Sequence, residues 1–114
     1  MAKRKYLFLD DLRNPYDCIV YMQRRGFDSK IYTLPWEIVR SYTEFTDWIQ
    51  QNGVPGIISF DHDLGETDKS GFDCAKYLLN YCIDNKVKVP VYLIHSSNPV
   101  GAENIKSLLE GYLN

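Results

Sequence analysis

The chain has 114 residues, of which 45% are hydrophobic and 25% charged, and its net charge is −2 at pH 7. This composition predicts one globular domain over residues 1–114 and excludes a largely disordered chain. The charge argues against strong binding to duplex nucleic acid, and no apolar run reaches the length of a membrane span. Three cysteines without paired spacing indicate reduced thiols, as expected of a cytoplasmic protein.

Four short runs of apolar residues are expected to form strands. They cover residues 6–9, 36–42, 56–60 and 90–94. Three of these runs are continuous, which is typical of parallel strands that are covered on both faces. The run at 36–42 alternates in polarity and indicates an edge strand.

Helical periodicity separates these runs. A short helix is predicted within 16–25, followed by an irregular segment. Three later segments place apolar side chains on one helical face, at 45–49, 72–82 and 102–112. Thr43 is predicted to cap the first of these three helices, and Asn98 before Pro99 is a strong start signal for the last.

This alternation predicts an open, mainly parallel α/β sheet of about four strands, with helices on both faces. Ligands of such three-layer sandwiches bind beyond the carboxyl ends of the strands. Polar clusters follow three of the strands: Asp10 and Asp11, then Asp61, His62 and Asp63, then His95, Ser96, Ser97 and Asn98. We expect these clusters to meet at one edge of the sheet.

Each cluster by itself also has a structural interpretation. Aspartates after strands often form turns or caps, and a lone histidine at a strand end is more often structural than catalytic. Several carboxylates at one edge, however, repel one another unless a divalent cation or altered protonation relieves them. We therefore predict a site for Mg²⁺ or Mn²⁺, which prefer oxygen ligands. The predicted ligands are Asp10, Asp11, Asp61 and Asp63.

Three motifs of the chain resemble the receiver domains of two-component signalling. The paired acids that end the first strand of a receiver are matched by LFLDD at residues 7–11. The third strand and its phosphate-accepting acid, here Asp61, are matched by ISFDHDLG at 58–65, and the fourth strand by PVYLIHSSN at 90–98. The resemblance covers most of the chain and implies a receiver-like, flavodoxin-like fold.

Two features differ from an ordinary receiver. His95 stands where receivers place Thr or Ser, and neither a fifth strand nor the lysine that follows it is visible. The chain is more similar to a divergent branch in bacteria and phages, the cyclic-phosphate processing receiver-like domains. The motifs that carry this similarity are LDDLRNP, FDHDLG and HSSNPVGAEN. The resemblance implies a role with cyclic phosphates.

The residue types also fit phosphate chemistry. A cation at the acids would polarise a phosphoryl oxygen, and Arg13 can form two parallel hydrogen bonds to a phosphate. The helix start around Asn98 is a natural anion site. Histidine is the side chain that most often transfers protons in enzymes, so either His62 or His95 could protonate a leaving oxygen. The candidate catalytic residues are Asp61, His62 and His95, and the candidate phosphate ligands are Arg13, Ser96, Ser97, Asn98, Gly101 and Asn104.

Three functions remain open at this point. The first is a metal-dependent phosphoesterase, a hydrolase acting on RNA 2′,3′-cyclic phosphate ends or on cyclic nucleotides. The second is a module that binds such a small phosphorylated ligand or RNA end without turnover. The third is a degenerate signalling receiver that acts through protein contact. The two histidines favour the first over the third, but binding and cleavage use the same groups, so the sequence does not separate the first from the second.

Overall fold

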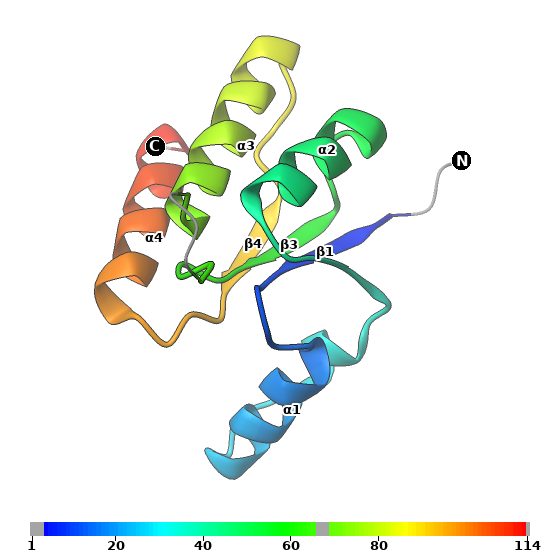
Figure 1. Cartoon of the computed structure of the whole chain (residues 1–114), viewed down its shortest axis with the longest axis vertical. Helices are drawn as coiled ribbons and strands as arrows, with labels where there is room; N and C mark the ends of the chain where they lie inside the picture. Colours follow the sequence, from blue (N-terminus) through cyan, green and yellow to red (C-terminus); the bar gives the residue numbers. More distant parts are fainter. Residues whose placement is uncertain (1–3, 66–68, 114) are drawn as a thin grey trace.

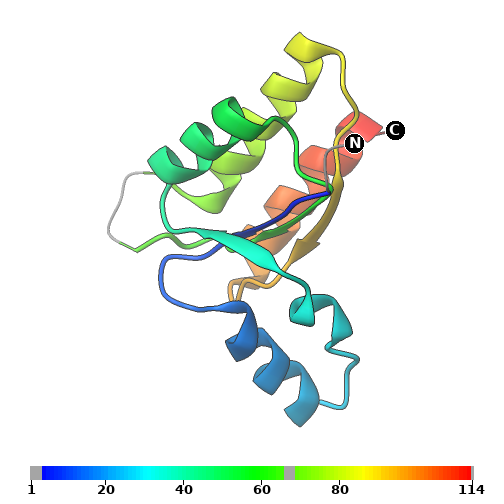
Figure 2. The ribbon, with the colours of Figure 1, turned by 90° about the vertical axis from the view of Figure 1, so that its right-hand side faces the viewer.

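The computed structural model describes residues 4–65 and 69–113, which form a parallel sheet with helices on both faces (Figures 1 and 2). The strands are β1 (Tyr6–Leu9), β2 (Trp36–Val39), β3 (Ile57–Phe60) and β4 (Val91–Ile94). Their order in the sheet is β2-β1-β3-β4, and every neighbouring pair is parallel. The predicted sheet of about four parallel strands is therefore confirmed, with β2 at one edge.

Helices cover the two faces of the sheet unequally. The helices are α1 (Pro15–Arg24), the short 3₁₀ helix η1 (Lys30–Thr33), α2 (Tyr42–Asn52), α3 (Gly71–Asn85) and α4 (Pro99–Leu113). Helix α1 and η1 lie on one face, and α2, α3 and α4 lie together on the other (Figure 1). No helix in the described ranges is both long and apolar enough to cross a bilayer.

Alternation along β1 divides the core into two clusters. Leu7 and Leu9 point toward α2–α4 and belong to a large cluster of buried side chains, whereas Phe8 points toward α1. Phe8 forms a smaller cluster with Cys18 of α1 and Tyr32 of η1. This two-sided burial is the reason why the strand has no polar positions.

Two helix starts bear on the expectations from sequence. Helix α2 is capped by Ser41, whose hydroxyl accepts a hydrogen bond from the Glu44 amide, so the prediction of Thr43 as the cap is wrong. Because the cap turns the chain at Ser41, β2 ends at Val39 rather than at residue 42. Helix α4 begins at Pro99, directly after Asn98, as predicted.

A close approach between β3 and α3 fixes the loop that follows Phe60. The Gly71 amide donates a hydrogen bond to the His62 carbonyl oxygen at 2.6 Å. A Cβ atom on Gly71 would lie 1.7 Å from the carbonyl oxygen of Asp61. Only glycine therefore allows the first turn of α3 to pack against the backbone that carries Asp61.

Replacing Gly71 by alanine is expected to lower the free energy of unfolding by about 1–3 kcal/mol, because the added methyl group would collide with backbone atoms. Urea denaturation measures this change. Gly111→Ala in α4 is the matched control, since a Cβ atom there meets nothing within 4 Å, and it should leave stability unchanged or raise it. A Gly71→Ala variant as stable as the wild type would contradict the packing described above.

Candidate functional site

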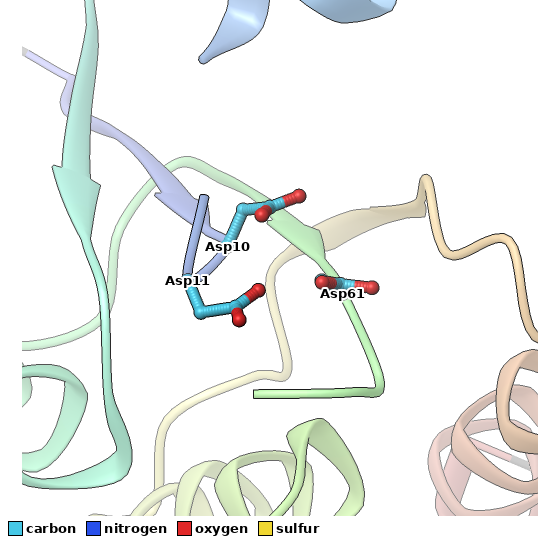
Figure 3. Close-up of side chains that lie close together, drawn as sticks. All are labelled: Asp10, Asp11 and Asp61. Carbon is cyan, nitrogen blue, oxygen red and sulfur yellow. The ribbon is translucent and has the colours of Figure 1, made fainter. Parts of the chain in front are cut away.

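Three carboxylates meet at the carboxyl ends of β1 and β3. Oxygen atoms of Asp10, Asp11 and Asp61 all lie within 4.8 Å of one another (Figure 3). Asp10 and Asp61 are side by side because the residues before them, Leu9 and Phe60, are register partners in the sheet. Asp10 is 1% and Asp61 5% exposed, so both carboxylates are withdrawn from water.

Arg13 joins the two buried acids. Its Nε donates to Asp10 Oδ2 at 2.9 Å and its Nη2 to Asp61 Oδ1 at 3.5 Å. Burial alone would raise the pKa of Asp10, but hydrogen bonds from His95 and from the amides of Arg13 and Leu12, together with the charge of Arg13, hold this pKa below its usual range. Burial and the neighbouring Asp10 carboxylate raise the pKa of Asp61 despite Arg13. The repulsion between the two acids is thus only partly relieved.

His95 lies behind Asp10 and is almost fully buried, with 4% of its side chain exposed. Its Nε2 lies 3.1 Å from Asp10 Oδ2, and its Nδ1 lies 2.6 Å from Ser59 Oγ. The Ser59 hydroxyl is in turn 2.9 Å from the Tyr32 hydroxyl, and the His95 ring stacks on Phe8 with centroids 4.3 Å apart. Both ring nitrogens are engaged, so this geometry favours positioning of Asp10 over contact with a ligand.

His62 and Asp63 form a separate pair on the side of α4. His62 Nδ1 lies 2.9 Å from Asp63 Oδ1, and the hydrogen bond from His62 lowers the pKa of Asp63. A Cβ atom on Gly101 would lie 2.3 Å from the His62 ring, which therefore packs on the first turn of α4. The Asp63 side chain is 62% exposed and lines the same cleft as Asp10, Asp11 and Asp61. It does not belong to the cluster of three carboxylates.

The predicted phosphate ligands are divided between the cleft and the start of α4. Arg13 and Ser97 line the cleft, which has a volume of about 560 Å³. The Asn98 amide donates to Ser96 Oγ at 3.1 Å, and Asn98 Oδ1 accepts from the Gly101 amide at 3.0 Å, so local side chains already cap this helix. Asn104 is exposed in the second turn of α4.

Arg40 is a residue of the site that the sequence analysis missed. Its Nη1 donates to the carbonyl oxygens of Arg13 at 2.7 Å and Asp10 at 3.2 Å, and its Nη2 donates to Asn14 Oδ1. Arg40 thereby holds the loop after β1 in the conformation that aims Arg13 at the acids. It is the first residue after β2, a position that the overlong strand prediction concealed.

Comparisons with known proteins agree with this fold. A receiver protein of a response regulator from Pseudomonas putida aligns over 95% of this chain and 82% of its own, with TM-score 0.58 and 18% identity. The N-terminal domain of a response regulator/sensory box/GGDEF protein from Carboxydothermus hydrogenoformans aligns over 91% and 74%, with TM-score 0.53 and 22% identity. A fusion that carries the yeast Spc42 trimeric coiled coil aligns over 94% of this chain, which spans 64% of that protein, with TM-score 0.55 and 21% identity.

The fold is therefore that of a receiver domain, and the family can be assigned more narrowly. No match was found among curated proteins. Residues 5–111, nearly the whole chain, match the family described as the cyclic-phosphate processing receiver domain. The chain belongs to the family of cyclic-phosphate processing receiver domains.

Proposed function

We propose that this domain is a metal-dependent phosphoesterase that acts on cyclic phosphates, either RNA 2′,3′-cyclic phosphate ends or cyclic nucleotides. One observation carries the proposal: three carboxylates and one guanidinium meet, largely desolvated, at the ligand-binding edge of the sheet. The family supports the class of ligand.

The donor set fits a divalent cation. Three carboxylates share the single positive charge of Arg13, and burial together with the Asp10 carboxylate raises the pKa of Asp61. Closely spaced carboxylate oxygens are the ligands that Mg²⁺ and Mn²⁺ prefer, so Asp10, Asp11 and Asp61 would hold such an ion. Asp63 lines the same cleft. When bound, it would supply Lewis-acid polarisation of a phosphoryl oxygen.

Side chains of the chain itself would bind the phosphate and move the proton. Arg13 has five N–H donors and is 36% exposed at the cleft, so donors beyond those on Asp10 and Asp61 can reach a phosphate oxygen, with Ser97 beside them. His62 is the better proton donor of the two histidines. Its Nδ1 lies within hydrogen-bond distance of Asp63, so Nε2 would be the atom that passes a proton to a leaving oxygen. His95 has no such nitrogen left.

The metal site is tested by calorimetry with Mn²⁺. Wild-type protein should bind one ion, and Asp61→Asn should weaken binding by at least about tenfold. Mutating a residue that only hydrogen-bonds to a metal ligand already lowers metal affinity by roughly that factor, and Asp61 is expected to be a ligand itself. Asp47→Asn removes the same charge from the exposed surface of α2 and should bind as the wild type does. Absence of binding to the wild type, or equal binding to Asp61→Asn, would refute the cation site.

The roles of His62 and His95 are distinguished by measuring turnover of a panel of 2′,3′- and 3′,5′-cyclic nucleotides. His62→Gln should lower kcat by about 10²–10⁴-fold with Mn²⁺ affinity unchanged, because Gln cannot shuttle a proton. His95→Gln should instead weaken Mn²⁺ binding by about 10–100-fold, because Asp10 loses the group that orients it. Turnover by both variants at the wild-type rate would show that neither histidine acts in catalysis. A wild type that binds but never cleaves would favour the binding module.

The signalling alternative is tested with beryllofluoride, which mimics phosphate on an aspartate. We expect amide shifts confined to the cleft, because Arg13 is already paired with Asp10 and Asp61 and the buried His95 occupies the place of the Thr or Ser of receivers. Two-dimensional NMR of labelled protein measures these shifts. Amide shifts that spread to α4 and β4 would instead favour the hypothesis of a degenerate signalling receiver.

A further inference from the structure

A second cavity opens beside the carboxylate cleft, between α1 and the loop after β4. Its volume is about 260 Å³. Arg13 and Ser97 line both this cavity and the cleft, so the two spaces share a wall. A ligand with a phosphate at the carboxylates would therefore have to pass Arg13 and Ser97 to reach the cavity.

The outer wall of the cavity is aromatic and exposed. Tyr21 is 56% and Phe27 61% exposed, which is costly for large apolar side chains that flank one cavity. The position of Phe27 is fixed by the backbone. Gly26 has φ +76° and donates to the Gln23 carbonyl oxygen, while the Phe27 amide donates to that of Met22 at 2.9 Å, which is the pattern that ends a helix in a Schellman motif.

Size and chemistry select a flat ring with polar edges. Ligand pockets for drug-sized molecules have volumes of roughly 300–1,000 Å³, so this cavity takes only one ring system. Its lining includes apolar side chains, those of Cys18, Met22 and Ile94. Polar lining groups that can meet a ring edge come from Asp17, His95 and two serines. Aromatic side chains that stack bases, with hydroxyl groups at the ring edge, are what proteins use to bind unpaired nucleobases.

We propose that this cavity, the base subsite, binds the nucleobase of a nucleoside phosphate whose phosphate lies among Asp10, Asp11 and Asp61. Tyr21 and Phe27 flank the base, and Arg13 and Ser97 lie between base and phosphate. The inference rests on the proposed function and assigns the part of the site that recognises the base. Cyclic phosphates that carry a base are substrates, and small cyclic phosphates without one bind weakly.

The test compares two ring-opened products, so that turnover does not interfere: adenosine 3′-monophosphate and glycerol 2-phosphate, each titrated with Mn²⁺ present. Wild type should bind the nucleotide more tightly. The combined variant Tyr21→Ala/Phe27→Ala should weaken nucleotide binding about 10–100-fold and leave glycerol 2-phosphate unaffected. Tyr21→Phe keeps the ring and should keep the affinity. Tyr16→Ala is the matched control, since this tyrosine of α1 is 69% exposed and lies outside the walls of the cavity.

The outcomes separate this inference from the proposed function. If both compounds bind the wild type equally and the Tyr21→Ala/Phe27→Ala variant is unaffected, the base subsite is wrong and the phosphate site stands. An equal loss of affinity for both compounds in that variant also contradicts the base subsite. If neither compound binds the wild type, the proposed phosphate site fails and the base subsite falls with it. Circular dichroism of each variant verifies that the fold is intact.

Discussion

The pairing of Leu9 with Phe60 forces two acids into contact at a place that water hardly reaches. Neighbouring parallel strands leave Asp10 and Asp61 adjacent, and a buried carboxylate is unstable without hydrogen bonds or opposite charge. The two acids meet this constraint differently. Asp10 collects donors from His95, Arg13 and the loop amides, whereas Asp61 remains under the influence of its neighbour, and their pKa values move in opposite directions.

Two sets of hydrogen bonds hold the Asp10 side chain and its loop in position. On the α1 face of the sheet, a series of hydrogen bonds runs from Asp10 through His95 and Ser59 to Tyr32, across an otherwise apolar layer. Burial raises the pKa of Tyr32 to about 12, so the phenol keeps its proton and the series stays neutral at its far end. From outside, Arg40 fixes the loop that presents Arg13. No buried side-chain nitrogen or oxygen atom in the described ranges lacks a hydrogen-bond partner, which is why this polar network is compatible with the core.

Topology made the convergence of the acids predictable, because strand–helix alternation determines which ends of the strands share an edge. The direction of individual side chains was harder to foresee. Ser59 lies within the apolar run at 56–60, but its buried hydroxyl requires hydrogen-bond partners, which are His95 and Tyr32. Its alternate position in β3 places it on the face of α1, but the 3₁₀ helix that supplies Tyr32 is too short to leave a periodic signal. The cavity beside α1 depends on that same tertiary packing.

The unequal packing on the two faces of the sheet gives the domain two levels of local stability. Three helices enclose the large cluster, while α1 and η1 are held by a small one around Phe8. Regions with fewer buried apolar contacts open at lower free energy than the global core. We therefore expect the layer of α1 and η1 to open at a lower free energy than the layer of α2, α3 and α4, while Asp10 and Asp61 stay at the ends of the central strands β1 and β3. On this expectation, the wall that α1 gives to the base subsite adapts in shape more easily than the strand ends that carry the charged groups.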